Sequence, residues 1–438
     1  MASSPQWFSR ARKAIGRNEM LVHVLHLMTG TATAQLVVLA LTPILSRIYT
    51  PADYGLFAVY SSIVALVSAV ATLRYDMAIM LPKDDDTART LKSTVTWIAF
   101  LTGVLASLVC LVAAPQLASL MNAPAVGPWL VLVGLSTFTL GEISALVYWL
   151  NRHSRYKQIS TNRVLQSGAT AVVQILLGLT RALGVGGLIL GTIVGQIVSI
   201  VGLRRKTPDL APSTAPTVHE RLSVMNRYRR MPLLNAPTAL IDAVRINGIN
   251  LLIGFYSIAS LGQFSMAWRM VEVPAALISS ALAQVFFQKL SVVSPGHMYD
   301  AAKKSVVRSA AFGAVPFVLV YVLAPWVFPV FFGSNWDLAG PYAQALVPWL
   351  FMNLVTSPIS TIFVITEKQH VLLLFSAVFM VVPLAIIVTM NANMLQAVFT
   401  MGLAMAAMLL IFVALAFRVA RRYDSVPNHG PVMSETEP

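Results

Sequence analysis

Long runs of apolar residues alternate with short polar segments along the whole chain. A helix needs about 20 mostly apolar residues to cross the hydrocarbon core of a bilayer, and twelve runs meet this requirement. The pattern therefore predicts an all-α integral membrane protein. Its expected transmembrane helices lie at residues 23–45, 55–73, 93–115, 127–150, 163–180, 185–203, 233–255, 263–287, 306–329, 342–365, 370–390 and 395–417.

The longest polar segment between two runs, residues 204–232, lies midway along the chain and contains Pro208, Pro212 and Pro216. A linker here would divide the chain into two lobes of six helices each, a layout found in several transporter families. We expect the N-lobe at 23–203 and the C-lobe at 233–417. Residues 1–22 would form a basic N-terminal segment, and residues 418–438 a polar tail that is predicted to be disordered.

Composition strengthens the membrane assignment. Of the 438 residues, 57% are hydrophobic and 11% charged, whereas roughly 25% of residues are charged in an average soluble domain. A soluble fold could not bury so much apolar surface, so lipid must be the solvent for most of it. A single cysteine, Cys110, excludes an internal disulfide.

The positive charges give the orientation. Of the 31 Lys and Arg residues, all but Arg47, Arg181, Arg245 and Arg269 fall in segments on the same side as the N-terminus. Basic loops stay in the cytoplasm, so both termini are expected to be cytoplasmic. The net charge of +14 is gathered beside apolar runs and forms no basic stripe on a soluble module, which argues against nucleic acid as a partner and for anionic lipid.

Two sequence blocks flank the second run. The bottom-up interpretation of the first block is a turn followed by a helix start, where Asp53 can accept hydrogen bonds from free amide groups. The blocks read Ser46-Arg47-Ile48-Tyr49-Thr50-Pro51-Ala52-Asp53-Tyr54-Gly55 and Arg74-Tyr75-Asp76-Met77-Ala78-Ile79-Met80-Leu81-Pro82.

Together these blocks closely resemble the polysaccharide transporter family, the O-antigen flippases of the Wzx type. Ala52 replaces an acidic residue that is usual in the family, and Asp76 stands for the usual Glu. The residues that carry the resemblance are Ser46, Arg47, Tyr49, Pro51, Asp53, Gly55, Arg74, Tyr75, Asp76 and Pro82.

The resemblance implies membership of the multidrug/oligosaccharidyl-lipid/polysaccharide exporter superfamily, in which two six-helix lobes surround a central cavity. It also implies a substrate, an oligosaccharide linked through pyrophosphate to undecaprenol, which is moved to the outer leaflet of the bacterial inner membrane. A polysaccharide polymerase and a chain-length regulator are the protein partners expected for such a flippase.

Few charged residues fall near the middle of predicted spans, where each costs roughly 2.5–3.5 kcal/mol or more. Arg245 and Arg269 are candidates for binding the pyrophosphate, because a guanidinium offers a fork of donors that matches phosphate oxygens. Asp242 and Glu272, each three residues from one of these arginines, and Glu142 are candidates for coupling to a proton or cation. Amides expected to contact the glycan are Asn247, Asn250 and Gln263.

A structural interpretation of these residues stays open. Each arginine could be neutralised by its acidic neighbour and hold helices together, and Glu142 could bond to the backbone of another helix. No residues have the spacing of a metal site, a catalytic nucleophile or a phosphate-binding glycine loop, so neither an enzyme nor a cofactor is expected.

Three alternative functions remain. A drug or cation exporter of the same superfamily would favour acidic cavity residues, whereas the mid-membrane charges here are mixed. A membrane polysaccharide polymerase or ligase would need a sizeable outer loop, and the predicted outer loops have about a dozen residues or fewer. A scaffold that transports nothing is compatible with the sequence.

Overall fold

The computed structural model of this chain consists of helices, and the residues that it describes contain no strand. The predicted basic segment up to residue 18, the middle of the predicted linker (211–215) and the predicted tail from residue 426 lie outside the described part. The structure describes residues 19–121, 123–210, 216–291, 296–360, 362–366 and 369–425.

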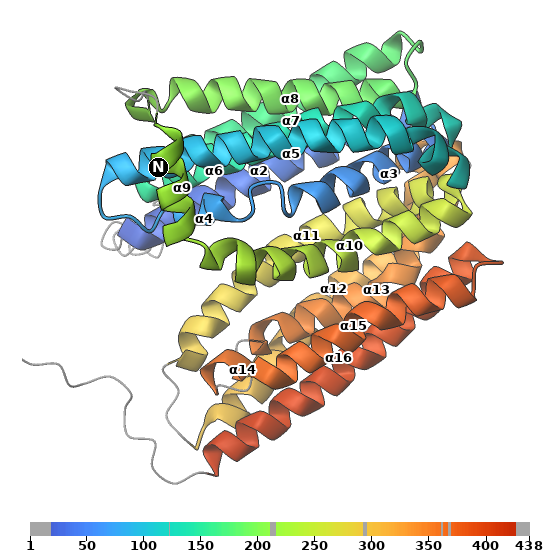
Figure 1. The fold of residues 1–438 in the computed structure, drawn as a ribbon. Coiled ribbons are helices and arrows are strands. Elements are labelled where there is room, and N and C mark those ends of the chain that lie inside the picture. The colour runs from blue at the N-terminus through green and yellow to red at the C-terminus, as the bar shows by residue number, and fades with distance from the viewer. Residues whose placement is uncertain are drawn as a thin grey trace, which may run out of the picture. The chain divides into compact units, whose positions relative to one another are not determined.

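The chain divides into two compact units, Met1–Ile258 and Ala259–Pro438. In the first unit α7 packs on α2 and α8, α6 on α5 and α8, and α10 on α3 (Figure 1). Its helices are α2 (Glu19–Ile48), α3 (Pro51–Ser68), α4 (Tyr75–Ala78), α5 (Asp85–Leu120), η1 (Pro124–Leu132), α6 (Val133–Arg152), α7 (Tyr156–Leu179), α8 (Val185–Arg205), η2 (Pro208–Leu210), α9 (Val218–Arg227), η3 (Met231–Asn235) and α10 (Ala236–Tyr256).

In the second unit α13 packs on α12 and α16, and α15 packs on α16. Its helices are α11 (Ile258–Ser291), α12 (Met298–Phe332), η4 (Ser334–Trp336), α13 (Ala339–Thr356), η5 (Ser357–Ile359), α14 (Ile362–Ile365), α15 (Gln369–Thr389) and α16 (Met394–Asp424). The two units are defined by the packing of helices, and by this criterion α10 belongs to the first unit. They do not test the predicted lobe boundary at 204–232, which stays a prediction.

The all-helical membrane architecture is confirmed. The twelve apolar ranges fall on helices, but three of them are divided: 127–150 between η1 and α6, 233–255 between η3 and α10, and 342–365 among α13, η5 and α14. Eight helical segments of the described chain are long and apolar enough to cross a membrane. The helix α7, which contains the most polar of the predicted spans, is not among the eight. The count of twelve spans therefore stays a prediction.

The start of α3 confirms the predicted turn and helix start. Thr50 is the N-cap, and its hydroxyl accepts the amide hydrogen of Asp53 at 3.2 Å. The Asp53 carboxylate in turn accepts the amide of Thr50 at 3.0 Å, which completes a capping box. Pro51 occupies the first turn, where the missing amide hydrogen costs nothing.

Glycines on α8 allow its close packing against α7. A Cβ atom on Gly191 would collide with Gln174, and one on Gly195 would collide with Thr170. The spacing of four residues between the two glycines places both on the face that meets α7. The two glycines therefore let the backbones of α8 and α7 approach closely.

A carboxylate at the end of α16 caps the start of α12 in the second unit. Asp424 accepts hydrogen bonds from the amides of Gly296, Met298 and Tyr299 at 2.8–3.0 Å. Nearby, Arg421 donates to the Tyr299 hydroxyl at 2.9 Å and lies over its ring. The first turn of α12 thus obtains its cap from a residue more than a hundred positions later.

Candidate functional site

Glu142 is the most completely buried charged group of the described chain, with none of its side chain exposed. Helix α6 carries it against α5, where Lys92 and Thr96 donate to its two oxygens at 2.7 Å each. Arg204 of α8 donates to the same carboxylate at 3.0 Å. One carboxylate therefore holds two cations and joins three helices.

This arrangement bears on the prediction that Glu142 couples transport to a proton or cation. The carboxylate is already neutralised by two side chains, so it could accept another cation only if Lys92 or Arg204 withdrew. The coupling role stays a prediction. In the sequence analysis Lys92 and Arg204 contribute only to the orientation of the chain. Their contact with Glu142 could not be predicted, because they lie 50 and 62 residues away from it in the sequence.

A second buried carboxylate, Asp76, lies at the start of the short helix α4. It accepts hydrogen bonds from Thr72 at 2.9 Å and from Ser144 of α6 at 2.6 Å. Leu73 and Arg74 adopt left-handed backbone conformations with φ of 48° and 61°, which makes the sharp turn that directs Asp76 inward. The second family block therefore builds the junction of α3 with α6.

The other family residues also lie at helix junctions. Tyr49 is buried and donates to the backbone oxygen of Gln174 in α7 at 2.7 Å, and Tyr75 donates to that of Met225 in α9 at 3.0 Å. Gly55 lies so close to the backbone of Ile258 that a Cβ atom would not fit. Of the remaining members, Ser46 is buried, Arg47 is exposed, and the Pro82 oxygen accepts a hydrogen bond from Arg152 at 2.6 Å.

Helix α10 carries two of the predicted site charges near its middle. Arg245 donates to Asp242 at 3.4 Å, and the side chains are 32% and 61% exposed. Asn235 and Thr238 precede them at spacings of three and four residues, so the four polar side chains share one face of the helix. Leu240 and Val244 are exposed on another face of α10.

The predicted amides of α10 are engaged in the first unit. Asn250 donates to the Ser62 hydroxyl of α3 at 3.1 Å, and Asn247 donates to the backbone oxygen of Ala243 one turn earlier. Both side chains are half-buried. Asn250 therefore contributes to the packing of α10 on α3, and neither amide is aligned with the polar face that carries Arg245.

Helix α11 carries the remaining predicted residues. Arg269 and Glu272 are half-buried and share the i, i+3 spacing, yet they form no ion pair with each other or with any other side chain that the structure describes. Gln263 is buried and donates to the backbone oxygen of Asn335 at 2.7 Å. The ion pair that the structural interpretation allows is thus found for Arg245 and Asp242, and not for Arg269 and Glu272 among the described side chains.

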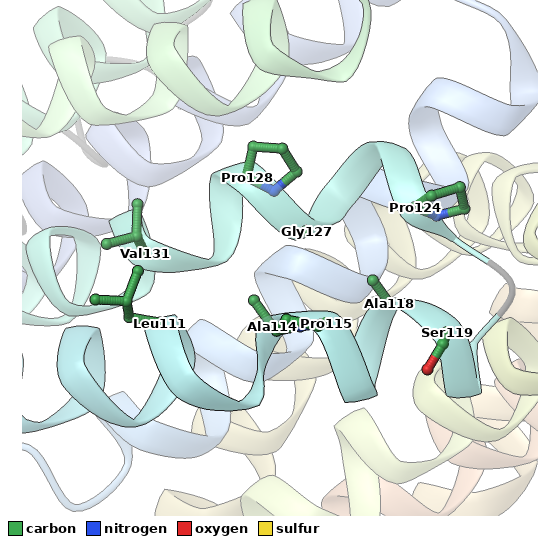
Figure 2. Close-up of a pocket in the computed structure, with 9 residues that line it drawn as sticks. All are labelled: Leu111, Ala114, Pro115, Ala118, Ser119, Pro124, Gly127, Pro128 and Val131. Atoms are coloured by element: carbon green, nitrogen blue, oxygen red, sulfur yellow. The ribbon is translucent and has the colours of Figure 1, made fainter.

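A cavity of about 730 Å³ lies between α5 and η1, and Figure 2 shows the residues that line it. Its lining is apolar apart from Ser119, and three of the residues around it are prolines: Pro115, Pro124 and Pro128. Such a lining offers no charged group for a pyrophosphate, and it suits hydrocarbon. Among the described residues no three His, Cys, Asp or Glu side chains are grouped to hold a metal ion.

The sequence of this chain matches the model of one protein family over most of its length. The model of a family described as "Polysaccharide biosynthesis protein" matches residues 44–341. No curated protein matches the sequence significantly.

Solved structures share the fold over nearly the whole chain. The lipid II flippase MurJ, in an inward closed conformation, has a TM-score of 0.68 at 11% identity, and the match covers 92% of this chain and 90% of MurJ. An inward-facing multidrug resistance MATE family transporter of the MOP superfamily has a TM-score of 0.61 at 13% identity and coverage of 91% and 94%. A MOP superfamily transporter from Pyrococcus furiosus scores 0.58 at 14% identity, with coverage of 92% and 95%.

Proposed function

Because the chain belongs to the family of polysaccharide biosynthesis proteins, we propose that it is a flippase for an oligosaccharide linked through pyrophosphate to undecaprenol. The cargo would be a repeat unit of O-antigen, capsule or exopolysaccharide, carried across the bacterial inner membrane. The presence of a lipid II flippase among the structures with the same fold supports this class of substrate.

The observation that carries the proposal is the exposed ion pair halfway along α10. Asp242 and Arg245 lie near the middle of a segment, Met231–Tyr256, that is long and apolar enough to cross the membrane. Exposed charges at this depth are tolerated where they face a water-filled space. The polar face of α10 therefore favours an aqueous path, while its face with Leu240 and Val244 suits contact with lipid.

Arginine is suited to the anionic part of such a substrate. The pyrophosphate must pass a medium of low dielectric constant, where a guanidinium forms paired, charge-assisted hydrogen bonds to phosphate oxygens. Arg245 forms an ion pair with one exposed carboxylate, that of Asp242, at 3.4 Å. A phosphate can replace this carboxylate. Arg269 has no carboxylate partner among the described side chains.

In this mechanism the sugar and pyrophosphate enter from the cytoplasm while the polyprenyl tail stays in lipid. Two lobes would then alternate between inward and outward openings, as binding energy shifts the balance between the two states. Prolines inside α2, α11 and α13, namely Pro43, Pro274 and Pro348, interrupt the helices at places where they can bend. A polymerase and a chain-length regulator would act on the product.

Alanine at Arg245 or Arg269 tests the proposal. In cells that lack the chromosomal gene, each variant should abolish surface polysaccharide, because it removes a cation that the pyrophosphate needs, and the lipid-linked repeat unit should accumulate inside. Surface polysaccharide is measured by gel and by labelling of intact cells, and membrane insertion by immunoblot of the membrane fraction.

Matched controls separate this effect from a general loss of basic residues. Arg227→Ala and Arg308→Ala each remove an exposed arginine outside the middle of a span and should leave the polysaccharide at wild-type level. Wild-type polysaccharide in both Arg245→Ala and Arg269→Ala, at native levels of membrane protein, would refute the cationic path. Accumulated repeat units on the outer side would instead favour a polymerase or ligase.

A further inference from the structure

A polar cavity of about 530 Å³ lies beside the first turns of α5 in the first unit. Its wall is formed by six polar residues and Trp97 of α5, by Leu210 of η2, by Pro216 and by Glu220 of α9. The surrounding segments belong to the side that the charge distribution predicts to be cytoplasmic. The cavity contains none of the residues assigned above to substrate binding.

The face of α5 that lines this cavity runs directly into an exposed apolar surface. Thr90, Ser93 and Trp97 are three and four residues apart and therefore share one face of the helix. Trp97 is 48% exposed, and tryptophan is typical of the boundary between headgroups and hydrocarbon. The cavity therefore lies at the level of the lipid headgroups. Beyond Trp97 the exposed side chains on this face are Leu101, Val104 and Leu108.

Arg221 of α9 supplies a cation at this level. Its guanidinium lies 5.2 Å from the centre of the Trp97 ring and donates to the Ser93 hydroxyl at 3.3 Å. No carboxylate of the described residues lies within ion-pair distance of it, and its Nε is buried without a hydrogen-bond partner. A half-buried guanidinium in this condition is stabilised by an anion.

The other charged side chains that line the cavity already have partners. Arg89 pairs with Asp86 at 2.7 Å, and Lys92 pairs with the buried Glu142. The Glu220 carboxylate accepts the amide of Thr217 at 2.7 Å, where it caps α9. Arg221, which contacts the lining residues Ser93 and Trp97, is therefore the cation beside this cavity that has no carboxylate partner within the part of the chain that the structure describes.

We propose that this cavity binds the phosphate diester of an anionic phospholipid such as phosphatidylglycerol. Arg221 would hold the phosphate, with the Ser93 hydroxyl beside it, and the acyl chains would follow the apolar face of α5. Basic pockets between membrane helices on the cytoplasmic side are suited to such headgroups. The site ties α9 to α5 through a bound lipid and does not depend on the transported substrate.

Native mass spectrometry of the full chain in detergent tests this site. Wild-type protein is titrated with phosphatidylglycerol, with phosphatidylethanolamine and with inorganic phosphate, and retained ligand is counted. We expect retention of phosphatidylglycerol in preference to phosphatidylethanolamine, and no displacement by excess inorganic phosphate. Arg221→Gln should weaken the binding of phosphatidylglycerol about tenfold, because one charge-assisted hydrogen bond is lost.

Arg227→Gln is the matched control, since it removes an exposed arginine from the same helix and should bind lipid like the wild type. Arg221→Lys keeps the charge and should keep the preference for the anionic lipid. Equal retention of both phospholipids by the wild type, or unchanged binding by a folded Arg221→Gln protein, overturns the proposal. Displacement of the lipid by inorganic phosphate would assign the cavity to a soluble anion instead.

Discussion

At the scale of single residues, the decisive feature is that one carboxylate balances two cations inside the helical packing. Glu142 is fully buried, Lys92 is largely buried, and Arg204 reaches them from α8 with about half of its side chain exposed. Removing charges from water is costly, so the group is stable only while opposite charges remain together. A change at Glu142 therefore affects all three helices.

We predict that Glu142→Gln lowers the free energy of unfolding by about 3 kcal/mol or more, because Lys92 is then a largely buried cation without its counter-charge. The measurement is the unfolding midpoint of detergent-purified protein. Lys92→Gln introduced together with Glu142→Gln should recover part of the loss.

Asp86→Asn is the matched control, since it breaks an exposed ion pair with Arg89 in which Asp86 is 92% exposed. Its effect should stay below about 1 kcal/mol. Equal losses in Glu142→Gln and Asp86→Asn would show that burial of the carboxylate has no special consequence.

At the scale of helices, the short turn η2 fastens the end of α8 to its neighbours. The Asp209 carboxylate accepts hydrogen bonds from Trp149 of α6 at 3.1 Å and from Arg155 at the start of α7 at 2.9 Å. Arg89 of α5 donates to the Asp209 backbone oxygen at 3.0 Å. Burial alone would raise the pKa of Asp209, but the hydrogen bonds from Arg155, the Asp209 backbone and Trp149 lower it below its ordinary value of 3.8.

We predict that Asp209→Ala lowers the free energy of unfolding at neutral pH by about 1–2 kcal/mol, since two donors lose a charged acceptor. Because the folded-state pKa is depressed, this contribution is present above about pH 3.8 and is lost as the pH falls through the lower folded value. The unfolding midpoints of wild type and variant should therefore converge on acidification.

The control for this variant is Asp300→Ala, which removes an exposed carboxylate from the first turn of α12. The unfolding midpoint of this variant should lie close to that of the wild type, and the difference between the two should not show the same pH dependence. If the difference in unfolding midpoint between wild type and Asp209→Ala increased as the pH falls, the assigned direction of the pKa shift of Asp209 would be wrong.

At the scale of the whole molecule, the arrangement of charge predicts which ends of the helices face the cytoplasm. Thr180 ends α7 on the predicted outer side, and Ser223 lies on α9 on the predicted cytoplasmic side; both are exposed. The single native cysteine, Cys110, is buried in α5. The chain is therefore suited to labelling with single cysteines.

We predict that, in a Cys110→Ser background, Thr180→Cys reacts with a membrane-impermeant maleimide in intact cells, because its loop faces outward. Ser223→Cys should react only after the membrane is made permeable. Labelling is read by gel shift, and wild-type protein without added cysteines is the control. Reaction of Ser223→Cys in intact cells would reverse the predicted orientation.

The sequence predicted features that depend on neighbouring residues or on the lipid solvent. Spans follow from hydropathy because lipid leaves no other place for a long apolar run, and the cap at Thr50 follows from the local pattern with Asp53. Partners distant in sequence could not be predicted, as Glu142 and its cations show. The spacing of Arg269 and Glu272 permits a contact, but the surrounding packing decides whether their side chains meet.

The cap on α12 has a consequence for how the protein is made. Asp424 lies 126 residues after Met298, whose amide hydrogen it accepts, so α12 leaves the ribosome well before this carboxylate is synthesised. The first turn of α12 then keeps open amide groups until Asp424 has been made, whereas the first unit already has all of its helices. Assembly of the second unit should accordingly finish only after α16 is made, and a truncation before Asp424 would leave the start of α12 without this cap.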